Sequence, residues 1–212
     1  MNRSNFLQPL VPADTDHEND LESCPPRSVR GKEIGLGDVS WNGEIDAPAF
    51  KAFRHKTSHA DSSAAGSKYA LSIWGGKVED APPESAITLA TEFLARQNEI
   101  VDAVATAFCD EFHGRGLDSG MWWFNGLNRE DAAWVLQGRT FNTPDDMLAA
   151  LQLTGIIIRN DMDGVDGYIA HLCFHADFEE EHGVGVLTDV RKVLGTGYLE
   201  DVTPYGFKYD ET

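Results

Sequence analysis

A short stretch in the last quarter of the chain holds the side chains best suited to chemistry. Residues 171–186 contain three histidines, one cysteine and four carboxylates, and they end in a Gly-x-Gly pair. Imidazole, thiolate and carboxylate groups are the ligands that zinc takes in proteins. A carboxylate beside a histidine can also transfer protons. The stretch therefore admits a metal site, an acid–base or acidic binding surface, or a plain structural turn.

The metal interpretation depends on a strand at residues 168–178. Alternate residues of a strand share a face, so the polar residues from position 171 to 177 would lie together and the apolar residues between them would face the core. Neighbours on one strand face are about 6–7 Å apart, so only two of them can reach one ion without a bend in the strand. The candidate ligands for zinc or another divalent metal are His171, Cys173, His175, Asp177, Glu181 and His182. The alternative is a half-polar strand face with no metal.

An acidic turn follows this strand at residues 179–183. Glu179 and His182 are three residues apart, so a hydrogen bond between them would tie the turn, and this is the favoured structural interpretation. The same carboxylates would also form an acidic surface for a partner. The candidate binding residues are Asp177, Glu179, Glu180, Glu181 and His182.

Sequence motifs of the common enzyme classes are absent from the chain. No GxxxxGK[ST] loop accompanies Gly183-x-Gly185, and there is no GxSxG or HExxH motif. Residues 161–166 resemble the start of a calcium loop, but Leu172 stands where that loop needs glutamate, so an Asp-Gly turn explains them better. We therefore lean towards a protein that is not an enzyme and that needs no cofactor.

The composition excludes several classes of partner. With 17 basic and 35 acidic residues, the formal charge is -18, which would repel nucleic acid and anionic membranes and would favour a basic protein. Three cysteines without a CxxC spacing give no disulfide framework. No signal peptide and no membrane-spanning run is recognisable, so we expect a soluble cytoplasmic protein.

The hydrophobic pattern predicts a single α+β domain at residues 32–199, between an irregular tail at 1–31 and a C-terminal extension at 200–212. We expect a strand or a short hairpin at 34–45, with the turn at 41–44, because Asn-Gly is a strong hairpin signal. The other expected elements are a strand at 69–74, a long helix at 84–112, a short helix opened by Thr143 and Pro144, and a meander of strands from 154 to 194. The fold class is thus an antiparallel sheet packed against one long and one short helix.

The motif at residues 177–186 resembles the C-terminal signature of an uncharacterised bacterial domain family, the DUF6985 type. Glycines at 164, 167 and 195 fit the same pattern, and so do Trp41-x-Gly43 and residues 82–84 in the N-terminal half. The resemblance covers residues 34–199 and is strongest from 155 to 195. Four residues match the signature directly: Glu181, His182, Gly183 and Gly185.

The chain departs from this family at two positions. Phe178 or a residue near it stands in place of the usual tryptophan, and the usual cysteine is either shifted or replaced by His175, which weakens any role for Cys173. The resemblance carries no established activity. In size and acidity such domains are similar to small proteins encoded near bacterial toxin systems, which implies a protein-binding, immunity-like role. Two other hypotheses remain: a metal-dependent hydrolase or metal-binding protein, and a function in the aromatic segment 122–134.

Overall fold

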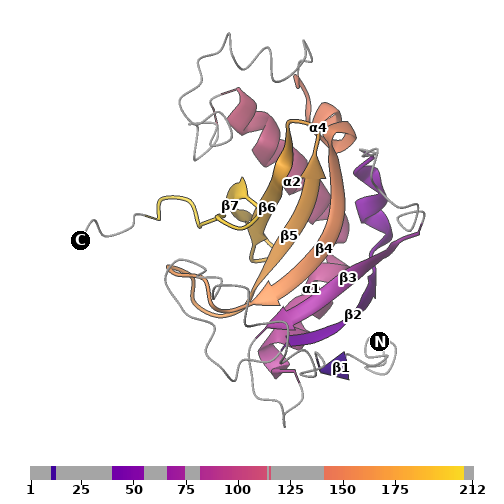
Figure 1. Ribbon diagram of the computed structural model, residues 1–212, viewed down its shortest axis with the longest axis vertical. Helices are drawn as coiled ribbons and strands as arrows, with labels where there is room; N and C mark the ends of the chain where they lie inside the picture. The colour runs from indigo at the N-terminus through magenta and orange to yellow at the C-terminus, as the bar shows by residue number, and fades with distance from the viewer. Residues whose placement is uncertain are drawn as a thin grey trace.

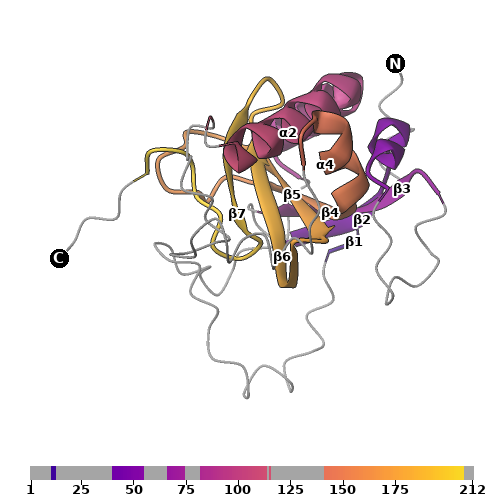
Figure 2. The ribbon, with the colours of Figure 1, turned by 90° about the horizontal axis from the view of Figure 1, so that it is seen from above.

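The computed structural model describes residues 11–12, 40–54, 66–74, 82–113, 115 and 141–207. These residues form a seven-stranded sheet with helices packed on one face (Figures 1 and 2). The strands are β1 (Val11–Pro12), β2 (Ser40–Asp46), β3 (Lys68–Trp74), β4 (Leu151–Arg159), β5 (Ile169–Ala176), β6 (Glu179–Thr188) and β7 (Val193–Tyr198). The helices are η4 (Pro48–Ala52), α1 (Glu84–Ala95), α2 (Gln97–Phe112) and α4 (Pro144–Ala150).

The strands lie in the sheet in their order along the chain, and one pair of neighbours is parallel. β3 and β4 run in the same direction, and all other neighbours are antiparallel. The α+β class and the C-terminal meander are confirmed, but the prediction of a purely antiparallel sheet is wrong. Parallel neighbours need a long crossover, and the chain supplies one because α1, α2 and α4 lie between β3 and β4.

Of the two alternatives predicted for residues 34–45, a strand or a short hairpin, the described part is the strand, because residues 40–46 form one continuous strand. The predicted turn lies inside β2, where Asn42 pairs with Ser72 of β3. Trp41 and Ile45 are both almost fully buried on the core face. Burial of these two side chains requires an extended backbone, and this outweighs the local preference of Asn-Gly for a turn.

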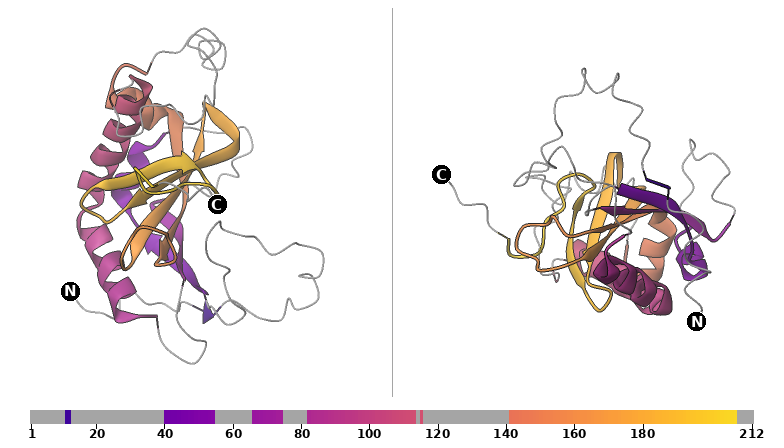
Figure 3. Two further views of the ribbon diagram at one scale, coloured as in Figure 1. Left: turned by 90° about the vertical axis from the view of Figure 1, so that its left-hand side faces the viewer. Right: turned by 90° about the horizontal axis from the view of Figure 1, so that it is seen from below.

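The predicted long helix is divided into α1 and α2 by a single residue, Arg96. Its backbone leaves the helical region with φ -114° and ψ 16°. Gln97 satisfies groups at this break, because its side chain donates to the Leu94 carbonyl at 3.1 Å and accepts from the Ala49 N–H at 2.8 Å. Figure 3 shows the two helices following one another along one side of the sheet.

The short helix begins as predicted. Thr143 caps α4 by accepting from the Asp146 N–H, and the Asp146 carboxylate accepts from the Thr143 N–H at 2.9 Å. This reciprocal pair is a capping box. The helix ends at Ala150, and Leu151 and Leu153 belong to β4 and are buried there.

The main core fills the space between the sheet and the helices. Aromatic rings connect its layers: Phe50 stacks on Phe93 at 5.2 Å between centroids, and Phe53 meets Phe174 edge-on at 4.9 Å. Aromatic pairs of this kind bury large areas and fix the relative positions of the elements. The core face of β5 is therefore rigidly held, and with it the polar residues on the opposite face.

A second, smaller core lies on the other face of the sheet. Val202 packs with Ile169 and Leu187. A Cβ added at Gly185 would lie 2.8 Å from Val202 Cγ1, and one added at Gly197 would lie 2.9 Å from Val202 Cα. Glycine at both positions lets the segment after β7 lie directly on the sheet. The described part of the predicted extension, residues 200–207, thus packs against the domain.

Candidate functional site

The polar residues of β5 alternate as the sequence predicts, but their surroundings differ. Leu172 and Phe174 face the main core, and the opposite face carries His171, Cys173 and His175. His171 is only 3% exposed, Cys173 is half-buried and His175 is exposed. One strand face therefore runs from the protein interior to the solvent over five residues.

His171 belongs to a buried polar cluster, defined here as Trp74, Arg159, Asp161 and His171. Arg159 makes two hydrogen bonds to Asp161, Nε to Oδ1 at 2.5 Å and Nη2 to Oδ2 at 2.7 Å. Its guanidinium lies 4.6 Å from the centre of the Trp74 ring, and its Nη1 is 3.5 Å from His171 Nδ1. A bidentate pair satisfies both charges, which is what allows them to be buried.

This environment keeps the His171 ring neutral. Burial, and then the nearby charge of Arg159, lower the pKa of His171 from 6.5 to about 3. The Leu199 backbone lies close enough to favour the protonated ring slightly, but Nε2 has no hydrogen-bond partner in the described part of the chain. Sequence reasoning identified His171 but missed Trp74 and Arg159, since no motif links residues on three different strands.

Cys173 is unsuited to nucleophilic or ligand chemistry as it stands. Its neighbours in register are Gly155 on β4 and Gly185 on β6. Burial raises the pKa of its thiol to about 12. The thiolate is the form that attacks and binds metals, so this side chain stays protonated at neutral pH.

The six candidate metal ligands do not converge. Within the described ranges, no three His, Cys, Asp or Glu side chains are close enough together to hold one ion. The candidates lie too far apart in exposure and position: His171 is buried beneath the segment after β7, whereas His182 is an exposed residue near the start of β6. The geometry gives the zinc prediction no support.

The predicted turn at 179–183 is wrong, because the chain turns at Asp177 and Phe178, and residues 179–183 open strand β6. The internal hydrogen bond that the sequence suggested is nevertheless present. Glu179 Oε1 accepts from the His182 N–H at 3.1 Å and from its Nδ1 at 2.9 Å. The Glu179 side chain is 13% exposed and that of His182 is 58% exposed. The hydrogen bond to Glu179, with smaller contributions from Glu181 and Asp201, raises the pKa of His182.

The segment that carries Asp201 follows β7 and is hydrogen-bonded to the first residues of β6. The Leu199 N–H donates to the Gly183 carbonyl at 3.2 Å, and the Asp201 N–H donates to the Tyr198 carbonyl at 3.0 Å. Glu180, Glu181 and Asp201 are all exposed. We call residues 179–182 together with Asp201 the acidic surface.

Two other candidates, Asp177 and the aromatic segment 122–134, are not part of the acidic surface. Asp177 is half-buried just before β6, and its backbone N–H donates to the Ala150 carbonyl at 2.9 Å. Residues 122–134, our third candidate region, lie outside the described residues. That hypothesis therefore stays a prediction.

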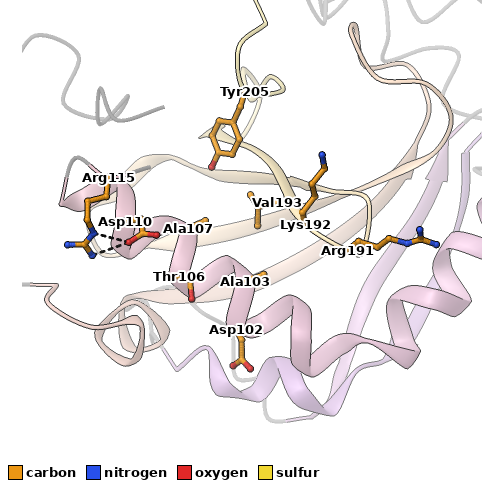
Figure 4. A pocket seen from close by; sticks show the side chains of 10 residues that line it. All are labelled: Asp102, Ala103, Thr106, Ala107, Asp110, Arg115, Arg191, Lys192, Val193 and Tyr205. Carbon is orange, nitrogen blue, oxygen red and sulfur yellow. Dashed lines mark hydrogen bonds and ion pairs between the residues drawn. The ribbon is translucent and has the colours of Figure 1, made fainter. Parts of the chain in front are cut away.

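A groove that the sequence did not reveal lies between α2 and β7 (Figure 4). Its volume is about 450 Å³. It is lined by Asp102, Ala103, Thr106, Ala107, Asp110, Arg115, Arg191, Lys192, Val193 and Tyr205. Its residues come from three separate stretches of the chain, and none of these stretches has a recognisable motif.

Comparison with known proteins identifies the family. The family model for a domain of unknown function (DUF6985) matches residues 43–203, and the chain belongs to this family. Neither a curated protein nor a solved structure matches the chain. In the part of the chain that the structure describes, none of the helices has the length and apolar character needed to cross a membrane.

Proposed function

We propose that this member of a family without known function is a non-enzymatic binding domain that docks a basic protein on its acidic surface. The observation that carries the proposal is the hydrogen bond between Glu179 and His182 at the start of β6. Because Glu179 holds His182 in place, Glu180 and Glu181 project into solvent beside Asp201. A fixed group of exposed carboxylates is a ready-made contact for Lys and Arg side chains.

The charge of the whole chain supports the same class of partner. A formal charge of -18 attracts cationic proteins over long distances and accelerates their encounter. It also repels nucleic acid, which argues against a direct role there. A cationic toxin, for example a basic nuclease, is the partner that an immunity-like domain of this charge would bind.

The chemistry of β5 gives no competing support for catalysis. His171 is neutral and buried, and Cys173 is a protonated thiol. A general base needs access to its substrate and a pKa near the working pH, and a nucleophilic cysteine needs a depressed pKa. Neither residue meets these requirements.

A charge-reversal comparison tests the proposal. The surface variant carries Glu180→Lys, Glu181→Lys and Asp201→Lys. The matched control reverses three exposed acids elsewhere, Asp46, Asp163 and Asp166. Both triple variants have the same net charge, so they separate the acidic surface from the general field of the molecule.

The three proteins are used as immobilised baits, and candidate partners are then purified and titrated by calorimetry at two salt concentrations. We expect at least one basic protein to bind wild type and the control, to lose about tenfold or more in affinity for the surface variant, and to bind more weakly in higher salt. Equal affinity for both triple variants would refute the acidic surface as the docking site.

A further inference from the structure

The groove between α2 and β7 has one wall built from a rigidly held aromatic ring. The Tyr205 hydroxyl donates to Oε1 of Glu111 at 2.7 Å, and its backbone N–H donates to the Leu194 carbonyl at 2.7 Å. Glu111 is fully buried and also accepts from the Thr196 hydroxyl. The ring is thus fixed at both ends before any ligand arrives, which reduces the entropy lost on binding.

A cross-braced turn places two cations at the same groove. Asp189 Oδ1 accepts from the N–H groups of Arg191 and Lys192, each at 2.9 Å. Thr188 Oγ1 accepts from the Val190 N–H at 3.0 Å and donates to the Lys192 carbonyl at 2.8 Å. These bonds hold the backbone that carries the two basic side chains.

Val190 adds backbone strain to this turn. Its φ is +66°, a left-handed conformation that a β-branched residue adopts only at a cost. Its side chain is buried in the main core, which holds the residue there. Strain of this kind is retained where the surrounding structure enforces a particular geometry.

The cations of the groove are available to a ligand to different degrees. Lys192 has no ion-pair partner among the described residues. Arg191 reaches Glu92 only at 3.4 Å, and both side chains are well exposed, so this pair is easily exchanged. Arg115 is held more tightly, by Asp110 at 3.0 Å.

The floor of the groove is small and apolar, and among the described residues neither acid that lines the groove, Asp102 or Asp110, pairs with Arg191 or Lys192. Ala103 and Ala107 of α2 and Val193 of β7 line it. Figure 4 shows Asp102 pointing away from Tyr205, and Asp110 joined to Arg115. The result is a locally cationic groove in a chain of net charge -18.

We propose that this groove binds a small planar organic anion. The acid group, a carboxylate or a phosphate, contacts Lys192, and Arg191 turns from Glu92 to join it; the flat body lies against the Tyr205 ring. The volume of about 450 Å³ lies within the range of small-molecule sites. Charge-assisted hydrogen bonds and ring contacts supply the affinity.

The test is an NMR titration of the full-length ¹⁵N-labelled chain with adenosine 5′-monophosphate, adenosine, inorganic phosphate, indole-3-acetate and neutral indole. We expect at least one of the two planar anions to shift the amides of Ala103, Ala107 and Val193. Its affinity should exceed those of its neutral parent and of phosphate by about tenfold or more. The two anions distinguish a phosphate ligand from a carboxylate ligand.

Two variants with matched controls locate the binding. Arg191→Ala with Lys192→Ala should weaken binding about tenfold or more, whereas Lys51→Ala with Lys68→Ala, two exposed cations elsewhere, should not. Ala107→Leu should block the floor, whereas Ala95→Leu at an exposed helical position should not. Amide spectra of each variant confirm that it is folded.

Three results would overturn the proposal. The first is the absence of shifts at the groove with either planar anion at millimolar concentration. The second is equal binding of inorganic phosphate alone, because the groove would then be only a charged surface. The third is unchanged affinity in both groove variants.

Discussion

His171 is a histidine that the folded protein keeps unprotonated. Its pKa in the folded state is about 3, below the value of 6.5 for an exposed histidine. Between these values the unfolded chain binds a proton that the folded chain does not. Acidification therefore favours unfolding. The free energy of unfolding should decrease as the pH falls from 6.5 towards 3, because protonation of His171 stabilises only the unfolded chain in this range.

We predict a pH-dependent difference between wild type and His171→Asn. From neutral pH to about pH 4, the wild type should lose up to roughly 1.4 kcal/mol more stability per pH unit than the variant. Urea denaturation at a series of pH values measures this slope. As a control, replacing the exposed His175 by Asn should leave the change of unfolding free energy with pH as in wild type. If the unfolding free energies of wild type and His171→Asn fall in parallel with pH, the prediction is contradicted.

Glu111 is a buried acid whose hydrogen bonds join a helix to the edge of the sheet. Thr196 of β7 and Tyr205 both donate to it. Removing one donor by Thr196→Val keeps the shape of the side chain but leaves the carboxylate less satisfied. We expect a loss of about 1–3 kcal/mol in urea denaturation.

The control for this change is Thr88→Val, at an exposed site on α1 where the hydroxyl donates to the Glu84 carbonyl of its own helix. That substitution should cost less than about 0.5 kcal/mol. A Thr196→Val variant as stable as the control would show that Glu111 does not depend on the Thr196 hydroxyl.

At the scale of elements, the sequence predicted the features that depend on interactions between residues close together in the chain. The cap at Thr143, the alternation along β5 and the tie between Glu179 and His182 each involve residues at most a few positions apart. The sequence could therefore identify them. The sequence left a strand and a hairpin open at 34–45, because the choice depends on pairing with the distant strand β3 and on the burial of Trp41.

Contacts between distant segments could not be predicted from the sequence in the same way. The parallel pairing of β3 with β4 brings Leu71 beside Ile156, and no pattern in one sequence encodes that register. The groove has the same origin, since Tyr205 meets α2 only in the folded chain. The polar cluster around Arg159 likewise needs three strands to be in place.

The segment after β7 gives a test of how closely it packs on the sheet. A methyl group at Gly195 would overlap the carbonyl oxygen of Thr203. At Gly155 the nearest atom to an added Cβ is the Ala70 carbonyl oxygen, at 3.9 Å, which is ordinary contact. We expect Gly195→Ala to cost about 1–3 kcal/mol or more, whereas Gly155→Ala should have little effect.

Thermal and urea denaturation of the two alanine variants measure this difference. Amide spectra should show further shifts at Val202 and Tyr205 in Gly195→Ala only, because the segment must move away from the sheet. Equal stability of the two variants would mean that the segment does not lie against Gly195 in solution.

In the whole molecule, the two proposed sites lie at opposite ends of β7. Val193 lines the groove at one end, and Tyr198 packs against the His182 ring at the other, with 5.2 Å between ring centres. One site is acidic and the other is locally cationic. The same edge strand thus carries one surface proposed to bind a cationic partner and one proposed to bind an anion, in a chain whose net charge is strongly negative.

This field should also govern the stability of the fold. A net charge of -18 makes the folded state repel itself, and salt shortens the range of that repulsion from about 30 Å at 0.01 M to about 8 Å at 0.15 M. We therefore predict that the melting temperature of wild type rises over this range of sodium chloride. Both triple charge reversals should show a smaller rise, because each reversal changes the charge by two and -18 becomes -12.

Comparing the two triple charge-reversal variants shows whether the repulsion comes from the charge of the whole molecule or from the acidic surface. If it comes from the whole molecule, reversing Asp46, Asp163 and Asp166 should reduce the salt response as much as reversing Glu180, Glu181 and Asp201. A reduction confined to the second triple would place the repulsion within the acidic surface itself. The acidic surface would then be a region of stored electrostatic repulsion, which a basic partner relieves on binding.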